Sequence, residues 1–212
     1  HTHRFYPVLE WGGPYIDLID NPSVMPYLEA VLGPGLRLDH DYLDVIRSGK
    51  GPIGTTLHGG ATPYDPLYSY RYDNGRMRNG LVVAAYTLKD VNPGDGGFGC
   101  VAGSHKANLP YPDEWKDLST ERDHVMKVTG PAGTCILFTE ALTHGTLPWQ
   151  GAGERRTVFY KYSPGSMSWS SRYYDARSYP GLTERQQALL EPPNARYPGR
   201  EKHASIVADG PE

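Results

Sequence analysis

The chain has 212 residues, of which 38% are hydrophobic, and a formal net charge of −3. This composition is typical of one globular domain and excludes a disordered or collagen-like chain, while the near-neutral charge gives no general attraction for nucleic acid or for an anionic membrane. No stretch approaches the roughly 18 apolar residues of a membrane span. The two cysteines, Cys100 and Cys135, are too few for a disulfide framework and are expected to be reduced.

The sequence begins at His1 without an initiator methionine and without the apolar run of a signal peptide. This start is compatible with a preceding segment that the sequence does not include. A cytoplasmic location is the default expectation.

The first predicted element is a helix over residues 22–32. Asn21 can cap this helix, Pro22 suits its first turn, and Gly33 ends it. Strand-like runs follow at residues 36–48, 78–91, 132–140, 141–149 and 155–164. Near the C-terminus, Thr183 and Gln186 predict the capping box of a second helix. Because strands do not alternate with long helices, the pattern favours a mainly β sandwich or barrel with a few helices outside it.

Two of the eight histidines differ from the others in their surroundings. His58 ("HGG") and His144 ("HGT") are both followed by glycine, which leaves space beside the imidazole. Arg155 lies eleven positions after His144 on a strand-like run, where a buried guanidinium needs an anion such as a carboxylate. None of the eight has a carboxylate two positions later, and His40, between two aspartates, is expected at the surface.

Two long stretches carry a resemblance to a known family. They are "YTLKDVNPGDGGFGCVAGSHKANLP" at 86–110 and "GPAGTCILFTEALTHGTLPWQGAGERRTVFYKYSP" at 130–164. With them the chain resembles, over nearly its whole length, the phytanoyl-CoA dioxygenase (PhyH) family of Fe(II)/2-oxoglutarate-dependent oxygenases. The resemblance implies a double-stranded β-helix, the cupin-like jelly roll, in agreement with the mainly β pattern. We therefore expect a single jelly-roll domain over residues 1–212.

The resemblance also implies roles for individual residues. His58 and His144 match the two metal-ligating histidines, and Arg155 matches the residue that pairs with the far carboxylate of 2-oxoglutarate, assisted by Thr146. Arg156 is the competing anchor, but on a regular strand it faces the opposite side from Arg155. His105, in the family's Gly-Ser-His stretch, is expected to be a structural residue or a supporting hydrogen-bonding residue rather than a ligand.

Gly60 departs from the family pattern, because the oxygenases carry Asp or Glu at this position. The same HxG variant of the metal motif occurs in the related halogenases, where chloride occupies the coordination position that the carboxylate leaves open. Two histidines and a carboxylate leave three positions on iron(II), of which 2-oxoglutarate takes two and dioxygen one. The first expectation is therefore a halogenase in which His58, Gly60 and His144 form the catalytic site.

Two alternatives remain open. A carboxylate from Glu140, Asp65 or Asp73, or a water molecule, can take the place of the missing ligand, and the protein is then a hydroxylase or another oxygenase of the family. A jelly roll can also be a non-catalytic ligand-binding module. In all three cases the expected partner is a small molecule, polar if residues 64–72 and 165–180 wall its pocket. The sequence does not indicate an oligomeric state.

Overall fold

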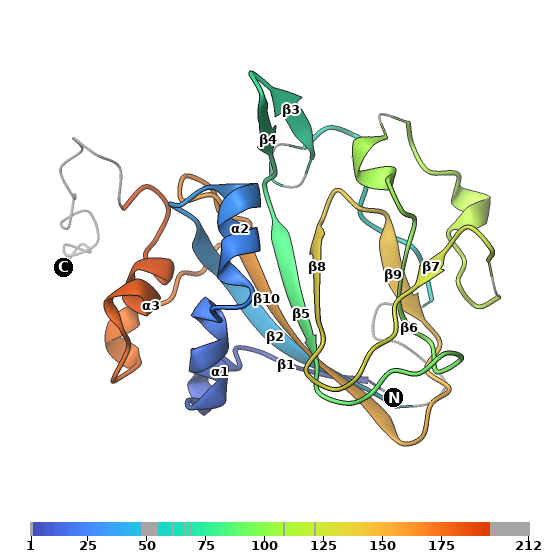
Figure 1. The fold of residues 1–212 in the computed structure, drawn as a ribbon, viewed down its shortest axis with the longest axis horizontal. Coiled ribbons are helices and arrows are strands. Elements are labelled where there is room, and N and C mark those ends of the chain that lie inside the picture. The colour runs from blue at the N-terminus through green and yellow to red at the C-terminus, as the bar shows by residue number, and fades with distance from the viewer. Residues whose placement is uncertain are drawn as a thin grey trace, which may run out of the picture.

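The structure, a computed structural model, describes residues 2–47, 55–60, 62–65, 67, 69–107, 109–120 and 122–195. Its antiparallel strands form a five-stranded sheet in the order β1-β2-β10-β5-β8, a three-stranded sheet in the order β7-β6-β9, and the hairpin β3-β4 (Figure 1). The strands are β1 (Thr2–Phe5), β2 (Arg37–Arg47), β3 (Arg71–Asp73), β4 (Arg76–Arg78), β5 (Val82–Thr87), β6 (Gly97–Cys100), β7 (Met126–Lys127), β8 (Cys135–Thr139), β9 (His144–Leu147) and β10 (Glu154–Ser163). The helices are α1 (Pro14–Asp17), α2 (Met25–Leu32) and α3 (Glu184–Leu189), with short 3-10 turns η1 (Leu9–Trp11), η2 (Leu18–Asp20), η3 (Ser104–Lys106), η4 (Asp113–Trp115) and η5 (Ala176–Ser178).

One hydrophobic cluster lies between the two sheets. It joins Val83 and Ala85 of β5 and Phe138 of β8 to Phe98 and Cys100 of β6, all of them buried. Two sheets that share a core in this way make the predicted jelly roll, and the mainly β fold class is confirmed.

A second and larger cluster lies on the outer face of the five-stranded sheet, where the helices cover it (Figure 1). Leu28 of α2 and Leu189 of α3 belong to this cluster together with Val158 of β10. Two tyrosines of β10 form hydrogen bonds to the N-terminal helical segment. Tyr160 donates its hydroxyl hydrogen to the Tyr15 carbonyl at 2.7 Å, and Tyr162 donates to the Ile19 carbonyl at 2.9 Å. The hydroxyl bonds let two large polar side chains be buried without loss of hydrogen bonding.

Of the three helix ends that the sequence predicts, two agree with the structure and one does not. The capping box of α3 is present in both directions between Thr183 and Gln186. The first helix ends at Gly33 as predicted, but α2 begins only at Met25. The Asn21 side chain accepts a hydrogen bond from the Ser23 amide at 2.9 Å, so that it stabilises a turn before the helix instead of capping the helix itself.

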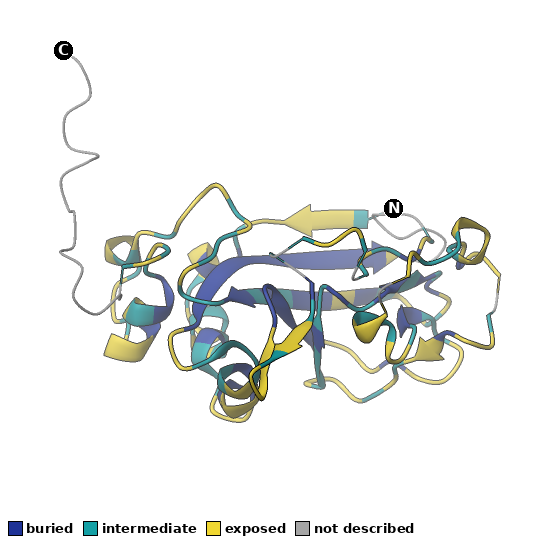
Figure 2. Cartoon of the chain, turned by 90° about the horizontal axis from the view of Figure 1, so that it is seen from above, coloured by how far each residue is buried: buried dark blue, intermediate teal, exposed yellow. Residues whose placement is uncertain are grey.

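The central strand β2 is buried on both faces and β10 is buried over most of its length, whereas β1 at the sheet edge is largely exposed (Figure 2). Along β10 the residues alternate in the regular way, with Arg155 and Lys161 facing the space between the sheets. On β2 the register shifts opposite Lys161 and Tyr162, since Lys161 pairs with His40 and Tyr162 with Leu38. The extra residue at this bulge is Asp39, and after it His40 faces the inside of the jelly roll.

Asp39 is fully buried and joins three parts of the chain. Its carboxylate lies 3.1 Å from Arg37 Nη1 and 2.7 Å from His40 Nδ1, and it accepts the backbone amides of Trp169 and Ser170 at 2.8 and 3.0 Å. Burial raises the pKa of Asp39, but the hydrogen bonds from His40 and Trp169 outweigh it and hold the pKa below its ordinary value.

Replacing Asp39 with alanine is expected to lower the free energy of unfolding by about 3–5 kcal/mol, because Arg37 stays buried without its counter-ion. Urea denaturation at neutral pH measures the loss. Since the folded pKa is depressed, the stabilisation is complete above the unfolded pKa of about 3.9 and is lost as the pH falls through the lower folded value. A loss below about 1 kcal/mol would show that the network contributes little.

Within the described residues, no helix is long and apolar enough to cross a membrane. Cys100 and Cys135 are free thiols, as expected.

Candidate active site

The two candidate metal histidines lie side by side. His144 is the first residue of β9, and His58 pairs with it through two backbone hydrogen bonds, with N···O distances of 2.7 and 2.9 Å. Their ring centroids are 4.4 Å apart. The structure therefore brings together two histidines that lie 86 positions apart in the sequence, and their bridge extends the three-stranded sheet beyond β9.

Each imidazole has one nitrogen fixed by a backbone carbonyl. His144 Nδ1 lies 2.7 Å from the Leu142 oxygen, and His58 Nδ1 lies 3.3 Å from the Thr56 oxygen. A carbonyl oxygen only accepts hydrogen bonds, so Nδ1 carries the proton and Nε2 keeps its lone pair. Burial also lowers the pKa of His144 to about 4, partly opposed by Glu140, so this ring is neutral at neutral pH. Neutral rings oriented through Nδ1 are the form in which histidine binds a metal.

The two glycines after His58 let the chain pass closely under the turn between β8 and β9. A Cβ on Gly59 would lie 2.6 Å from the Leu142 oxygen and 2.8 Å from the Glu140 oxygen, and the φ angle of Gly59 is +75°. At Gly60 a Cβ would meet only Thr143 Oγ1, at 3.4 Å, but φ is +112°. The backbone shape, rather than lack of space, therefore disfavours a side chain at Gly60.

A carboxylate nevertheless lies beside the histidines. Glu140 Oε2 is 4.0 Å from His144 Nε2, and Glu140 Oε1 is 2.6 Å from Lys161 Nζ. Burial raises the pKa of Glu140, but Lys161 outweighs it and keeps that pKa below its ordinary value, so the carboxyl group is ionised. Burial correspondingly lowers the pKa of Lys161, and the attraction of Glu140 reverses this, so the lysine is cationic.

The other two candidate carboxylates do not reach this position. Asp73 forms ion pairs with Arg71 and Arg78 on the exposed β3-β4 hairpin, and Asp65 accepts the Leu67 amide in a local turn. In the part of the chain that the structure describes, no three His, Cys, Asp or Glu side chains are already arranged around one metal position. The two histidine rings are oriented to bind a metal through Nε2. The Glu140 carboxylate, in contrast, is paired with Lys161 and does not face that metal position.

Arg155 lies on the inner face of β10 and is 3% exposed. Its Nε has no hydrogen-bond partner among the described residues, and burial lowers its pKa to about 10, with Asp44 opposing the shift. A buried guanidinium with an orphaned N–H has the chemistry to receive an anionic ligand, and a carboxylate fits its planar fork. Arg156 instead lies exposed on the other face, paired with Glu154 at 2.5 Å.

These groups border one cavity of about 400 Å³. Thr146, the residue expected to assist Arg155, also borders it. Aromatic side chains form part of its walls, namely Tyr6, Tyr42, Phe98, Phe138, Phe159 and Trp169. Apolar walls with a few polar groups among them are usual for sites that bind small molecules.

Two predictions about the surroundings of the cavity need correction. His40 is not at the surface, since it is 7% exposed and borders the cavity next to Trp169. His105 lies outside the cavity, where its ring edge packs against Tyr70 at 5.3 Å between centroids, and the neighbouring Ser104 accepts a hydrogen bond from the Thr143 amide at 2.8 Å. Among the described residues of 64–72 none borders the cavity, whereas segment 165–180 contributes Trp169 and Ser170.

A family model described as phytanoyl-CoA dioxygenase (PhyH) matches residues 43–157, more than half of the sequence. The chain belongs to the phytanoyl-CoA dioxygenase family. The matched region includes both histidines, Gly60, Glu140 and Arg155. No curated protein matches the sequence significantly.

Solved structures of HygX from Streptomyces hygroscopicus share the fold. The HygX structure with nickel and 2-oxoglutarate bound is 28% identical with a TM-score of 0.68, covering 82% of this chain and 74% of HygX. The structure with iron bound is 28% identical with a TM-score of 0.66, covering 82% and 76%. A third HygX structure, with nickel, 2-oxoglutarate and hygromycin B bound, is 27% identical with a TM-score of 0.62, covering 82% and 74%.

Membership of the phytanoyl-CoA dioxygenase family, together with the HygX likeness, confirms the predicted enzyme class, an Fe(II)/2-oxoglutarate-dependent oxygenase. The residues present fit the two groups, because two Nε2 atoms are free for a metal and the buried Arg155 lacks a partner for its Nε. Sequence reasoning missed Lys161 as part of this site. Lys161 lies six positions after Arg155 on the same strand, so both side chains face the inside of the jelly roll. This even spacing could have predicted Lys161 as part of the site.

Proposed function

We propose that this oxygenase hydroxylates a C–H bond of a polar small molecule, with Fe(II) held by His58, His144 and Glu140 and with 2-oxoglutarate anchored by Arg155. The observation that carries the proposal is the ionised Glu140 carboxylate, 4.0 Å from His144 Nε2. It supplies the negative charge that the family usually takes from the residue two positions after the first histidine.

The path of the backbone supports this exchange of ligands. The Gly60 amide donates a hydrogen bond to the Glu140 carbonyl at 3.2 Å, so position 60 and position 140 are immediate neighbours. The Glu140 carboxylate can therefore take the place of the carboxylate that Gly60 lacks. Reaching the metal requires the Glu140 side chain to turn away from Lys161, and a divalent cation bound by the two histidines favours that turn electrostatically.

When bound, Fe(II) and 2-oxoglutarate supply the oxidising power that activates dioxygen toward a C–H bond. The residues of the chain position and shield these groups. Arg155 would hold the distal carboxylate of 2-oxoglutarate with the assistance of Thr146, and the aromatic side chains would pack around the bound molecule. If the Glu140 carboxylate turns to the metal, Lys161 loses its ion-pair partner. Its ammonium group then faces the cavity as a cation.

Halogenation is the second candidate function, and two observations favour it. Gly60 offers no ligand, and the cationic Lys161 borders the same cavity and would attract a halide. A halide would however have to bind beside the ionised Glu140, and like charges at this range repel strongly in a buried site. Hydroxylation is therefore the function that the geometry supports better.

The visible charge-transfer absorption of the protein with Fe(II) and 2-oxoglutarate, without oxygen, tests the proposal. We expect a band that does not shift when chloride is added. A band that shifts with chloride would replace hydroxylation by halogenation. Absence of any band would mean that the two histidines and Arg155 do not form this site, as in a non-catalytic binding module.

The HygX structure that holds hygromycin B supports a small molecule as substrate. The polar side chains that line the cavity, among them His40, Ser170 and the Arg4–Asp44 pair at 2.7 Å, favour a substrate with polar groups over an aliphatic chain.

A further inference from the structure

The active-site cavity contains a third imidazole that the proposed metal site does not use. His40, on β2, borders the same cavity as His58 and His144 and is 7% exposed. In the part of the chain that the structure describes, it forms no metal-binding group of three side chains with the other two histidines. A nearly buried imidazole in this cavity therefore has a role other than metal binding.

Asp39 fixes the orientation of the His40 ring. Its carboxylate lies 2.7 Å from His40 Nδ1 and is itself held by Arg37 and by the amides of Trp169 and Ser170. Although burial raises the pKa of Asp39, the hydrogen bonds that it accepts hold this pKa below its ordinary value, so the carboxylate is ionised. Because an ionised carboxylate only accepts hydrogen bonds, Nδ1 carries the proton, and in the neutral ring the lone pair is on Nε2.

The surroundings of the His40 ring leave Nε2 open to the cavity. The ring is inclined by 17° to Tyr42 and by 31° to Trp169, with ring centroids 6.1 and 5.0 Å apart. Nε2 forms no hydrogen bond with the described residues, and it is not one of their fully buried polar atoms without a partner. A molecule in the cavity can therefore reach a nitrogen whose position is set before any ligand binds.

Other acceptors that border the cavity are already used. The two carboxylate oxygens of Asp44 accept hydrogen bonds from a neighbouring arginine at 2.7 Å each, and Glu140 is paired with a lysine at 2.6 Å. The hydroxyl groups that border the cavity can rotate, so they do not impose a direction on a bound donor. His40 Nε2 is the acceptor, outside the proposed metal site, whose direction the fold fixes.

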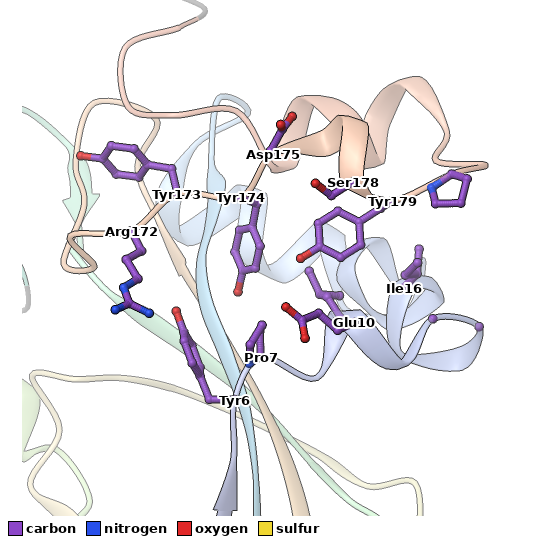
Figure 3. Close-up of a pocket in the computed structure, with 14 residues that line it drawn as sticks. Tyr6, Pro7, Glu10, Ile16, Arg172, Tyr173, Tyr174, Asp175, Ser178 and Tyr179 are labelled. Carbon is purple, nitrogen blue, oxygen red and sulfur yellow. The ribbon is translucent and has the colours of Figure 1, made fainter. Parts of the chain in front are cut away.

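On the other face of the sheet, β2 presents no such group. Asp41 accepts the amides of Val8 and Leu9 and the hydroxyl hydrogen of Tyr174. Leu9 and Tyr174 border a separate hollow of about 780 Å³ (Figure 3). Among the described residues that line this hollow, no fully buried side-chain nitrogen or oxygen lacks a partner. The open polar atom of this part of β2 is therefore on the cavity side.

We propose that His40 orients the substrate by accepting, at Nε2, a hydrogen bond from an O–H or N–H group of the substrate. The role rests on the proposed function, because it assigns the substrate to the cavity that holds the metal site. Asp39 is then a positioning residue, since it decides which ring nitrogen meets the substrate. A molecule without the donor leaves Nε2 unpaired in a nearly buried place and is bound less well.

Phenol and toluene test this acceptor in the full-length chain, because they have nearly the same size and shape and differ by one O–H donor. Metal is left out so that the phenol oxygen cannot bind it instead. NMR titration gives the ratio of the phenol affinity to the toluene affinity. In His40→Phe, which keeps a flat ring and removes Nε2, this ratio is expected to fall about fivefold, as loss of one neutral hydrogen bond provides. An unchanged ratio, or no binding of phenol to the wild type, would overturn the proposal.

His124→Phe is the matched control. It removes an exposed histidine outside the cavity and is expected to leave the affinity ratio as in the wild type. A ratio that falls equally in both variants would contradict the assignment to His40.

The wild type also allows a test that needs no variant. Long-range ¹H–¹⁵N spectra of the His40 ring at neutral pH are expected to show a protonated Nδ1 and a bare Nε2. The Nε2 resonance should move toward the value of a protonated nitrogen when phenol is added, and not when toluene is added. A protonated Nε2 in the free protein, or no shift with phenol, would overturn the proposal.

The role of His40 and the proposed function fail separately. Absence of the Fe(II) and 2-oxoglutarate band, with the phenol shift at Nε2 intact, would contradict the proposed function alone. A normal band without the shift would contradict the role of His40 alone.

Discussion

Replacing Arg155 with alanine is expected to weaken 2-oxoglutarate binding by more than about tenfold, because the carboxylate of the ligand is left in a buried site without its charged partner. Titration of the Fe(II)-loaded protein with 2-oxoglutarate, followed by the charge-transfer band, measures the loss. Arg156→Ala is the matched control. It removes the neighbouring arginine from the exposed face of β10 and is expected to leave 2-oxoglutarate affinity unchanged.

The stability of the Arg155→Ala variant makes this test unambiguous. Without ligand, Arg155 is a buried cation with an orphaned Nε, so its removal is expected to cost little stability or to increase it. Thermal unfolding should then show that adding 2-oxoglutarate to the Fe(II)-loaded protein raises the Tm of the wild type more than that of the variant. Weaker binding in Arg156→Ala together with unchanged binding in Arg155→Ala would move the anchor to Arg156.

Replacing Glu140 with glutamine is expected to weaken Fe(II) binding by about a hundredfold or more. Loss of a residue that merely supports a ligand costs about 10–100-fold in metal affinity, and loss of a ligand costs at least as much. The same change leaves Lys161 buried without its carboxylate, so the variant is also expected to lose about 3–5 kcal/mol of stability. Equilibrium dialysis against Fe(II) and urea denaturation measure the two effects separately.

A double variant separates metal binding from folding. Glu140→Gln combined with Lys161→Met removes both charges, so it is expected to regain most of the stability and none of the Fe(II) affinity. If the double variant binds Fe(II) as tightly as the wild type, Glu140 is only the partner of Lys161. Water or a halide would then complete the metal site beside Gly60.

Regular alternation explains why much of the site could be predicted. On β10, a period of two places Arg155 inside and Arg156 outside, as the sequence indicated, and it places Lys161 inside as well. The capping box of α3 was equally local, since Thr183 and Gln186 need only each other. Family resemblance supplied the pairing of His58 with His144, which no local pattern contains.

The errors come from contacts that depend on distant parts of the chain. His40 lies in a run of alternating charges that suggests an exposed strand, but β2 is central, and the bulge at Asp39 turns His40 inward. The start of α2 was misplaced because the Asn21 side chain serves a turn. From the sequence, Glu140 was one of three acids that could replace the missing ligand. Its distance from His144 depends on the turn between β8 and β9, against which the backbone of Gly59 and Gly60 packs.

A crystal structure of the protein with Ni(II) and 2-oxoglutarate would test the proposed metal site most directly. We predict the metal at about 2.0–2.2 Å from Nε2 of His58, Nε2 of His144 and a carboxylate oxygen of Glu140, values usual for such ligands. The distal carboxylate of 2-oxoglutarate should form a forked pair with Arg155. Glu140 still bonded to Lys161, with water or chloride in its place on the metal, would contradict this assignment of the ligands.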